Sequence, residues 1–213
     1  KKKDLSIAIL FDLCGPKIRI GNLNRKKNIS IKEGEIYSLG YKRCKIPLNI
    51  PLTFSSIVNN GVVKINDGEL SFKIIDFKKE KLQVMAENSG KITSGKGVNF
   101  PGVKLKLPSV TKKDLKDIKL AVDLNIDWLA MSFVRSADDY DAIKKELELH
   151  ASNIPIIAKI EKPEAINDLK KIITKFDGIL VARGDLGVEI SLHELPILQK
   201  KIVTCNLHIS TNN

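Results

Sequence analysis

The 213-residue chain has few aromatic residues, few cysteines and no long apolar run. Aromatic side chains are 5% of the residues, too few for a surface on which bases stack, so we expect no nucleic-acid partner despite the net charge of +11. The irregular spacing of Cys14, Cys44 and Cys205 matches neither a CxxC metal site nor a disulfide framework, and indicates reduced thiols. Without an 18-residue apolar stretch or a signal-peptide pattern, we expect a cytoplasmic protein with no membrane partner.

The second half of the chain alternates between two hydrophobic periods. Residues 127–133, 154–160 and 178–183 are short, continuous apolar runs, which are typical of parallel strands buried on both faces. The segments between them have helical stripes of apolar residues: Leu115, Ile118 and Val122; Tyr140, Ile143 and Leu147; Ile166, Leu169 and Ile173. The sequence therefore predicts a series of β/α units.

The starts of these helices are also marked. Thr111 and Asp114 have the spacing of a capping box, and Ser136 and Asp139 repeat it before the second helix. Pro163 stands in the first turn expected for the third helix.

Residues 17–108 have a different pattern. Alternating segments at 71–77 and 81–86, with turn signals in "NNG", "NDG" and "NSGK", predict an all-β module without helices. The apolar segment 7–12 before it resembles the later strands. We therefore expect a discontinuous barrel domain at 1–17 and 108–213, interrupted by a small β-barrel domain at 18–107.

Charged side chains stand where the predicted strands end. In a barrel of β/α units, the working residues lie at the carboxyl ends of the strands. These ends carry Asp12; Ser132 and Arg135; Lys159 and Glu161; and Arg183 and Asp185. Two carboxylates from consecutive strands, Glu161 and Asp185, suit one Mg²⁺, and Lys159 points to the same side of its strand as Glu161.

Simpler interpretations remain open for each of these residues. Lys159 and Glu161 suit an ordinary salt bridge at a barrel rim, and Asp185 suits a turn or a helix N-cap. Several charges at several strand ends favour a site, since salt bridges need not converge on one face. Gly184 would let an anion approach backbone N–H groups closely.

The order and spacing of several segments resemble pyruvate kinase over almost the whole chain. The matching segments are "DLCGPKIRIG", "INDGEL", "GVNFPGVKLKLPSVTKKD", "MSFVRSADD", "AKIEKPEAI" and "DGILVARGDLGVEI". The resemblance implies a (β/α)₈ TIM barrel, partial in this chain, with the β module as a lid. It also implies a glycolytic phosphotransferase that moves the phosphoryl group of phosphoenolpyruvate to ADP, giving pyruvate and ATP.

The resemblance assigns roles to individual residues. Glu161 and Asp185 would bind Mg²⁺ or Mn²⁺, and Lys159 would be the catalytic cation on the transferring phosphoryl group. The backbone at Ala182, Gly184 and Asp185 would hold the substrate carboxylate. Nucleotide-binding residues would be Arg19, which also counts as catalytic, with Lys113 and Asp67.

Two positions depart from the potassium-dependent members of the family. Those members have Thr after the aspartate of the first motif and Glu after "GP", where this chain has Leu13 after Asp12 and Lys17 after Pro16. The resemblance thus implies that K⁺ is not required, with the Lys17 ammonium in its place. A solvated surface lysine is the other interpretation of Lys17.

Parts of the family's pattern have no counterpart in this sequence. They include the first two barrel strands, the eighth strand and the C-terminal regulatory domain, and Thr211 in "IST" would be a remnant of the seventh strand with its substrate threonine. One hypothesis is that the chain is part of a working enzyme. The other is a truncated, catalytically silent relative that binds only a ligand or partner subunits. The family suggests a homotetramer.

Overall fold

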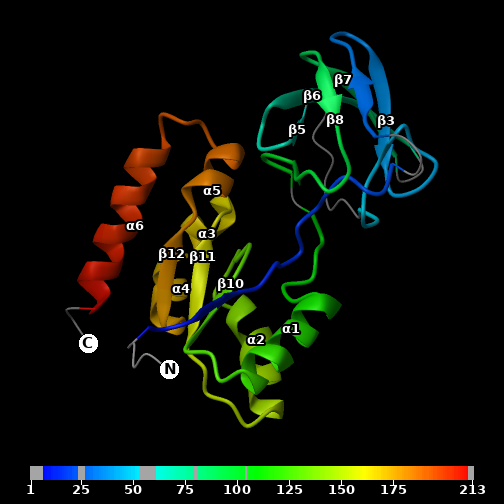
Figure 1. Ribbon diagram of the computed structural model, residues 1–213. Helices are drawn as coiled ribbons and strands as arrows, with labels where there is room; N and C mark the ends of the chain where they lie inside the picture. Colours follow the sequence, from blue (N-terminus) through cyan, green and yellow to red (C-terminus); the bar gives the residue numbers. More distant parts are fainter. Residues whose placement is uncertain (1–6, 24–26, 53–60, 79–80, 104, 211–213) are drawn as a thin grey trace. The chain divides into compact units, whose positions relative to one another are not determined.

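The computed structural model describes residues 7–23, 27–52, 61–78, 81–103 and 105–210. The chain divides into two compact units (Figure 1). Unit 1 consists of Lys1–Pro16, Pro108–Leu186 and His193–Asn213. Unit 2 consists of Lys17–Leu107 and Gly187–Leu192.

Unit 1 is built on a parallel four-stranded sheet. Its strands, in the order in which they pair, are β1 (Leu10–Asp12), β10 (Trp128–Met131), β11 (Ile156–Ile160) and β12 (Gly178–Val181). Its helices are α1 (Lys112–Asp123), α2 (Asp139–Leu149), α3 (Pro163–Asn167), α4 (Leu169–Lys175), α5 (Arg183–Glu189) and α6 (Leu195–Ser210). This succession of parallel strands and helices confirms the partial barrel.

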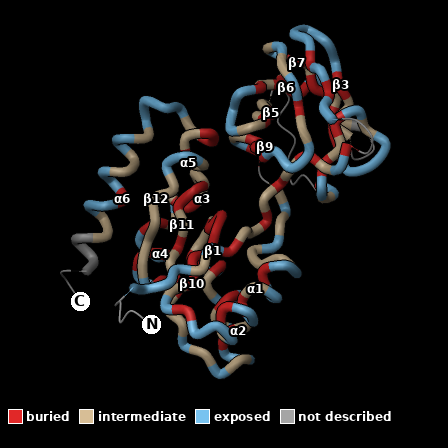
Figure 2. The backbone as a smooth tube through the Cα atoms, in the orientation of Figure 1, coloured by how far each residue is buried: buried red, intermediate tan, exposed pale blue. Residues whose placement is uncertain are grey.

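Burial differs between the middle and the edges of the sheet (Figure 2). In β10 and β11, side chains such as Leu129 and Ala158 are fully buried. In β12 all four residues are only half-buried, and Ile9, just before β1, is 56% exposed. The prediction that all these strands are buried on both faces was therefore wrong for β1 and β12, because each lies at an edge of the described sheet.

The start of α1 follows the sequence prediction, and its apolar stripe does so at Ile118 and Val122 but not at Leu115. Thr111 and Asp114 form the capping box, each side chain accepting a hydrogen bond from the backbone N–H of the other. The buried residues of α1 are Asp114, Ile118 and Ala121, whereas Leu115 is 38% exposed. Asp114 can lie on the buried face because its carboxylate accepts from the backbone N–H groups of Gly15 and Thr111.

The second and third predicted helices start or divide differently from the expectation. In α2, Ser136 is not the cap: the Asp139 carboxylate accepts from the backbone N–H groups of Arg135 and Ser136, and the helix begins at Asp139 itself. The third helix is interrupted at Asp168, giving α3 and α4. The Asp168 carboxylate accepts the Ala137 N–H at 2.8 Å, a contact that a continuous stripe does not foretell.

Unit 2 is all-β through residues 17–107 where it is described. A six-stranded sheet has the order β4 (Ile46–Pro47), β3 (Ile36–Gly40), β7 (Lys81–Ala86), β6 (Leu70–Lys78), β5 (Val62–Ile65) and β9 (Val98–Asn99). A second sheet pairs β2 (Ile29–Ile31) with β8 (Gly90–Ile92). The sheet encloses its own core, with Val63, Phe72 and Val84 fully buried.

Turns in unit 2 follow the glycine and asparagine signals where they are described. The "NDG" turn joins β5 to β6, with Asn66 and Asp67 both at positive φ, as a tight hairpin requires. The "NNG" signal begins at residues 59–60, which lie outside the described residues. No described helix is both long and apolar enough to cross a bilayer.

Candidate active site

The carboxyl ends of β1, β10 and β11 bring three polar side chains together around one ammonium group. Lys159 Nζ lies 3.0 Å from each carboxylate oxygen of Asp12, 2.9 Å from Ser132 Oγ and 3.0 Å from Glu161 Oε1. These four residues, here called the Lys159 cluster, come from the ends of three parallel strands, so they share one edge of the sheet.

Glu161 is the most deeply buried member of the Lys159 cluster. It is 1% exposed, and its Oε2 accepts the backbone N–H of Phe133 at 2.8 Å. Phe133 has a φ of +58°, a conformation that is rare for a bulky side chain. This turn directs an N–H group at the carboxylate, and no glycine or asparagine at 133 marks it in the sequence.

Charge and burial act against each other in this cluster. Burial is the main cause that raises the pKa of Glu161, and the nearby Asp185 carboxylate adds to the rise, while Lys159 and the Phe133 N–H oppose it. Burial by itself would lower the pKa of Lys159, but attraction to Glu161 and hydrogen bonds to Asp12 and Glu161 outweigh it, so that pKa is raised. Lys159 therefore stays a cation at neutral pH.

Asp185 is the second candidate metal ligand. It stands in the first turn of α5, directly after β12, and its charge acts on Glu161. Two carboxylates are the hard oxygen ligands that Mg²⁺ prefers, and Mg²⁺ is commonly held by one or two carboxylates with its other positions left to water and substrate. Among the described residues, no group of three or more acidic, His or Cys side chains is placed to hold a metal ion.

The segment that joins β12 to α5 leaves open space beside Gly184. Ala182 N–H donates to Ile160 O at 3.3 Å, and Leu186 N–H donates to Ala182 O at 3.0 Å, which begins the helix. A Cβ added at Gly184 would meet nothing within 4 Å, so the space beside it is open. Arg183 is exposed rather than buried at the end of the apolar strand.

The other predicted site residues are distributed over the two units. Lys113, in unit 1, is exposed and pairs with Asp117 on the next turn of α1. In unit 2, Arg19 Nη1 donates to Gly95 O at 2.9 Å, and Asp67 is exposed in the β5–β6 turn. Thr211 lies outside the described residues.

The residues predicted to replace a potassium site also fall in both units. Leu13 is 2% exposed in the core of unit 1 and offers no side-chain oxygen, while both Asp12 oxygens contact Lys159. Lys17 belongs to unit 2, where its Cε lies 3.5 Å from the position that a Cβ on Gly97 would take.

Asp114 has a role that the capping pattern did not reveal. Besides capping α1, its Oδ1 accepts the Gly15 N–H at 3.1 Å. Gly15 has a φ of +63°, and an added Cβ there would lie 3.0 Å from Ser132 O. Asp114 thus fixes the loop after Asp12 against the segment that carries Ser132.

Comparison with known proteins gives one consistent result. The chain matches the family described as "Pyruvate kinase, barrel domain" over residues 1–210. It is 37% identical to the pyruvate kinase of Thermotoga maritima over 99% of this chain and 46% of that protein. It is 40% identical to pyruvate kinase 2 of Synechocystis sp. over 92% of this chain and 35% of that protein. It is 36% identical to the pyruvate kinase of Staphylococcus aureus over 97% of this chain and 36% of that protein. The chain thus spans less than half the length of these relatives.

Proposed function

The chain belongs to the pyruvate kinase family, and from this premise we propose that it forms part of an enzyme that transfers the phosphoryl group of phosphoenolpyruvate to ADP, giving pyruvate and ATP. One observation carries the proposal: half-buried Lys159 and buried Glu161 form an ion pair at the carboxyl end of the sheet, and the charge of Asp185 acts on Glu161. Phosphoryl transfer depends mostly on positioning and on neutralising negative charge, which such a group of residues can provide.

In this proposal Glu161 and Asp185 would hold the metal ion. Bound there, Mg²⁺ or Mn²⁺ would supply positive charge to the phosphoryl and enolate oxygens. Lys159 has the same electrostatic role from the protein's side, because its raised pKa keeps it charged throughout the neutral range. Asp12 at the end of β1 and Ser132 after β10 hold its ammonium in position.

The backbone around Ala182, Gly184 and Asp185 would bind the substrate carboxylate. The open space beside Gly184 supports this role, because an anion can approach the N–H groups there without meeting a side chain. Arg19, Lys113 and Asp67 would contact the nucleotide. In this assignment the β module, residues 18–107, acts as a lid on the barrel residues 1–17 and 108–213.

The monovalent cation would not be needed. Leu13 has no side-chain oxygen to offer to K⁺, and the Asp12 carboxylate already has an ammonium partner in Lys159. Lys17 would supply the remaining positive charge in the assembled site, where a second cation would be repelled.

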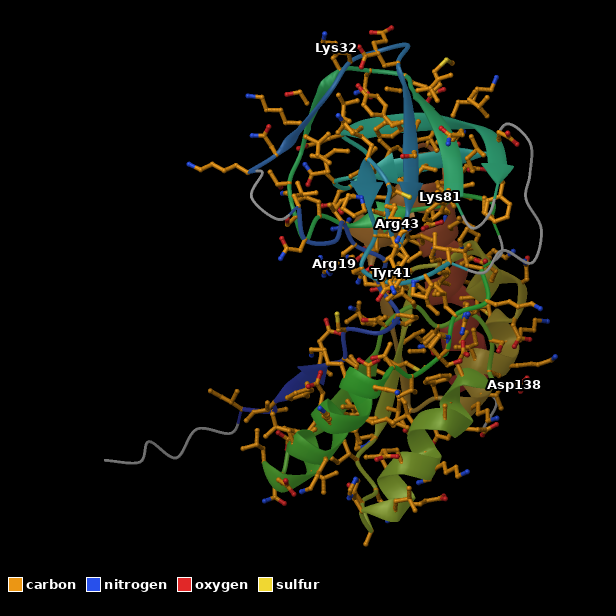
Figure 3. All side chains as sticks on the ribbon, turned by 90° about the vertical axis from the view of Figure 1, so that its right-hand side faces the viewer. Arg19, Lys32, Tyr41, Arg43, Lys81 and Asp138 are labelled. Atoms are coloured by element: carbon orange, nitrogen blue, oxygen red, sulfur yellow. The ribbon has the colours of Figure 1, made fainter. Side chains whose placement is uncertain are left out.

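Isothermal titration of the purified chain with Mg²⁺, followed by phosphoenolpyruvate, tests this proposal. Asp185→Asn should abolish measurable Mg²⁺ binding. The matched control is Asp138→Asn, since Asp138 is exposed and caps α2 without a side-chain hydrogen bond (Figure 3). Unchanged Mg²⁺ affinity in Asp185→Asn, or an equal loss in the control, would contradict the assignment.

A further inference from the structure

Unit 2 contains a pocket that none of the roles proposed above uses. Its volume is about 630 Å³, which is in the range of pockets that take small molecules. It is lined by Asn22, Leu23, Asn28, Ile29, Ser30, Tyr41, Arg43, Cys44, Lys45 and Pro47. The polar members are hydroxyl and amide groups and two cations, and no carboxylate is among them.

The charge of this pocket is positive on one side. Arg43 and Lys45 are both exposed and stand two residues apart in the segment between β3 and β4. Among the described residues, no carboxylate pairs with either of them. Lys42 and Lys81 lie close by, with Lys42 Nζ 5.2 Å from the centre of the Tyr41 ring.

The turn that carries these cations is held in place by several contacts. Arg43 has a φ of +53°, which is uncommon for a residue other than glycine or asparagine and is often found at functional positions. Lys81 Nζ donates to Arg43 O at 3.1 Å, and Lys45 N–H donates to Ser38 Oγ at 2.9 Å. Figure 3 shows Tyr41, Arg43 and Lys81 at the same end of unit 2.

We propose that this pocket binds a small phosphorylated metabolite that carries at least two anionic groups. Arg43 offers a planar fork of donors suited to phosphate, and Lys45 offers a second charge for the other group. Ser30, Tyr41 and Asn28 supply neutral polar groups, while Leu23, Ile29 and Pro47 give one wall an apolar surface for the body of the ligand. None of the residues that line the pocket is among those proposed for phosphoryl transfer, so the site gives unit 2 a ligand of its own.

Binding of inorganic pyrophosphate to the ¹⁵N-labelled chain, followed by NMR, tests the proposal. Saturable shifts are expected at the backbone amides of Ser30, Arg43 and Lys45, with weaker binding of orthophosphate, which has only one anionic group. Arg43→Gly removes the guanidinium yet suits the positive φ, so the turn is retained. It should weaken pyrophosphate binding about tenfold, as should Lys45→Gln.

Two variants distinguish specific binding in the pocket from the non-specific attraction of anions to a chain with net charge +11. Arg43→Lys keeps the charge and should recover part of the affinity. Lys32→Gln removes one positive charge at the opposite end of unit 2 from Arg43 in Figure 3, where Lys32 pairs with Glu35, and should leave binding unchanged. Equal weakening by Lys32→Gln and Arg43→Gly, or shifts spread over all surface lysines, would overturn the proposal. Because the readout is binding within unit 2, its failure would not bear on phosphoryl transfer.

Discussion

Replacing Glu161 with glutamine removes one negative charge from the Lys159 cluster with little change of shape. Loss of one partner of a buried ion pair typically lowers the free energy of unfolding by about 3–5 kcal/mol, because the other charge is left unpaired. Lys159 keeps two 3.0 Å contacts with Asp12 and one of 2.9 Å with Ser132. The introduced amide can still accept the Phe133 N–H. We therefore expect a smaller loss, about 1–3 kcal/mol.

The effect on metal binding should be much larger than the effect on stability. Loss of a group that only supports a metal ligand costs roughly 10–100-fold in affinity, so loss of a ligand itself should exceed that range for Mg²⁺. In the wild-type chain, burial raises the pKa of Glu161 above its ordinary value of 4.5. Protons therefore compete with Mg²⁺ at a higher pH than at an exposed glutamate, and affinity falls as the pH drops through the raised pKa.

The two effects can be measured on the same protein. Trp128, the only tryptophan of the chain, lies in β10 of unit 1, so its fluorescence during urea denaturation reports the unfolding of that unit. Titration calorimetry gives the Mg²⁺ affinity. The matched control is Glu148→Gln on the exposed face of α2, which should stay within about 0.5 kcal/mol of wild type. A Glu161→Gln variant that binds Mg²⁺ as tightly as the wild-type chain would show that Glu161 is not a metal ligand.

Stability, turnover and the response to K⁺ can each be tested separately. Asp114→Ala should lower the free energy of unfolding by about 2–3 kcal/mol, measured by Trp128 fluorescence in urea, whereas Asp123→Ala, at an exposed position later in α1, should cost less than about 0.5 kcal/mol. The 213-residue chain alone should show no turnover above background in a lactate dehydrogenase-coupled assay. The reason is that its described sheet has four of the eight strands of a closed barrel. A rate of about 10 turnovers per second would contradict this expectation. In a version of the enzyme restored to the length of its relatives, activity should be independent of the KCl concentration. The double substitution Leu13→Thr with Lys17→Glu should make that activity K⁺-dependent. Strong activation by K⁺ without these substitutions would contradict the proposal that K⁺ is not required.

The strands and the class of fold could be predicted from the sequence because short apolar runs and helical stripes repeat in order. What the pattern could not show was which strands lie at an edge: β12 is as apolar as β11, and only the pairing order makes it half-buried. The exact limits of a buried helix face were equally hidden, since α1 buries Asp114 and Ala121 beside Ile118 and leaves Leu115 exposed.

Within the candidate site, the sequence indicated which residues stand at strand ends but not which contacts they make. Lys159 and Glu161 were expected on one side of their strand from their spacing, and they form an ion pair. The contact of Lys159 with Asp12 spans 147 residues and depends on the parallel pairing of separate strands. The Phe133 N–H reaches Glu161 only because of a left-handed turn that no sequence signal marks.

The central claim, a metal ion held between Glu161 and Asp185, is tested most directly by crystals of the chain grown with Mn²⁺ and oxalate. Anomalous scattering locates Mn²⁺ without reference to the surrounding atoms. We expect one anomalous peak within coordination distance of an oxygen of each carboxylate, close to the 2.1 Å typical of Mg²⁺, with Lys159 Nζ beside the oxalate. A peak elsewhere, with both carboxylates uncoordinated or their side chains on opposite faces of the sheet, would contradict it.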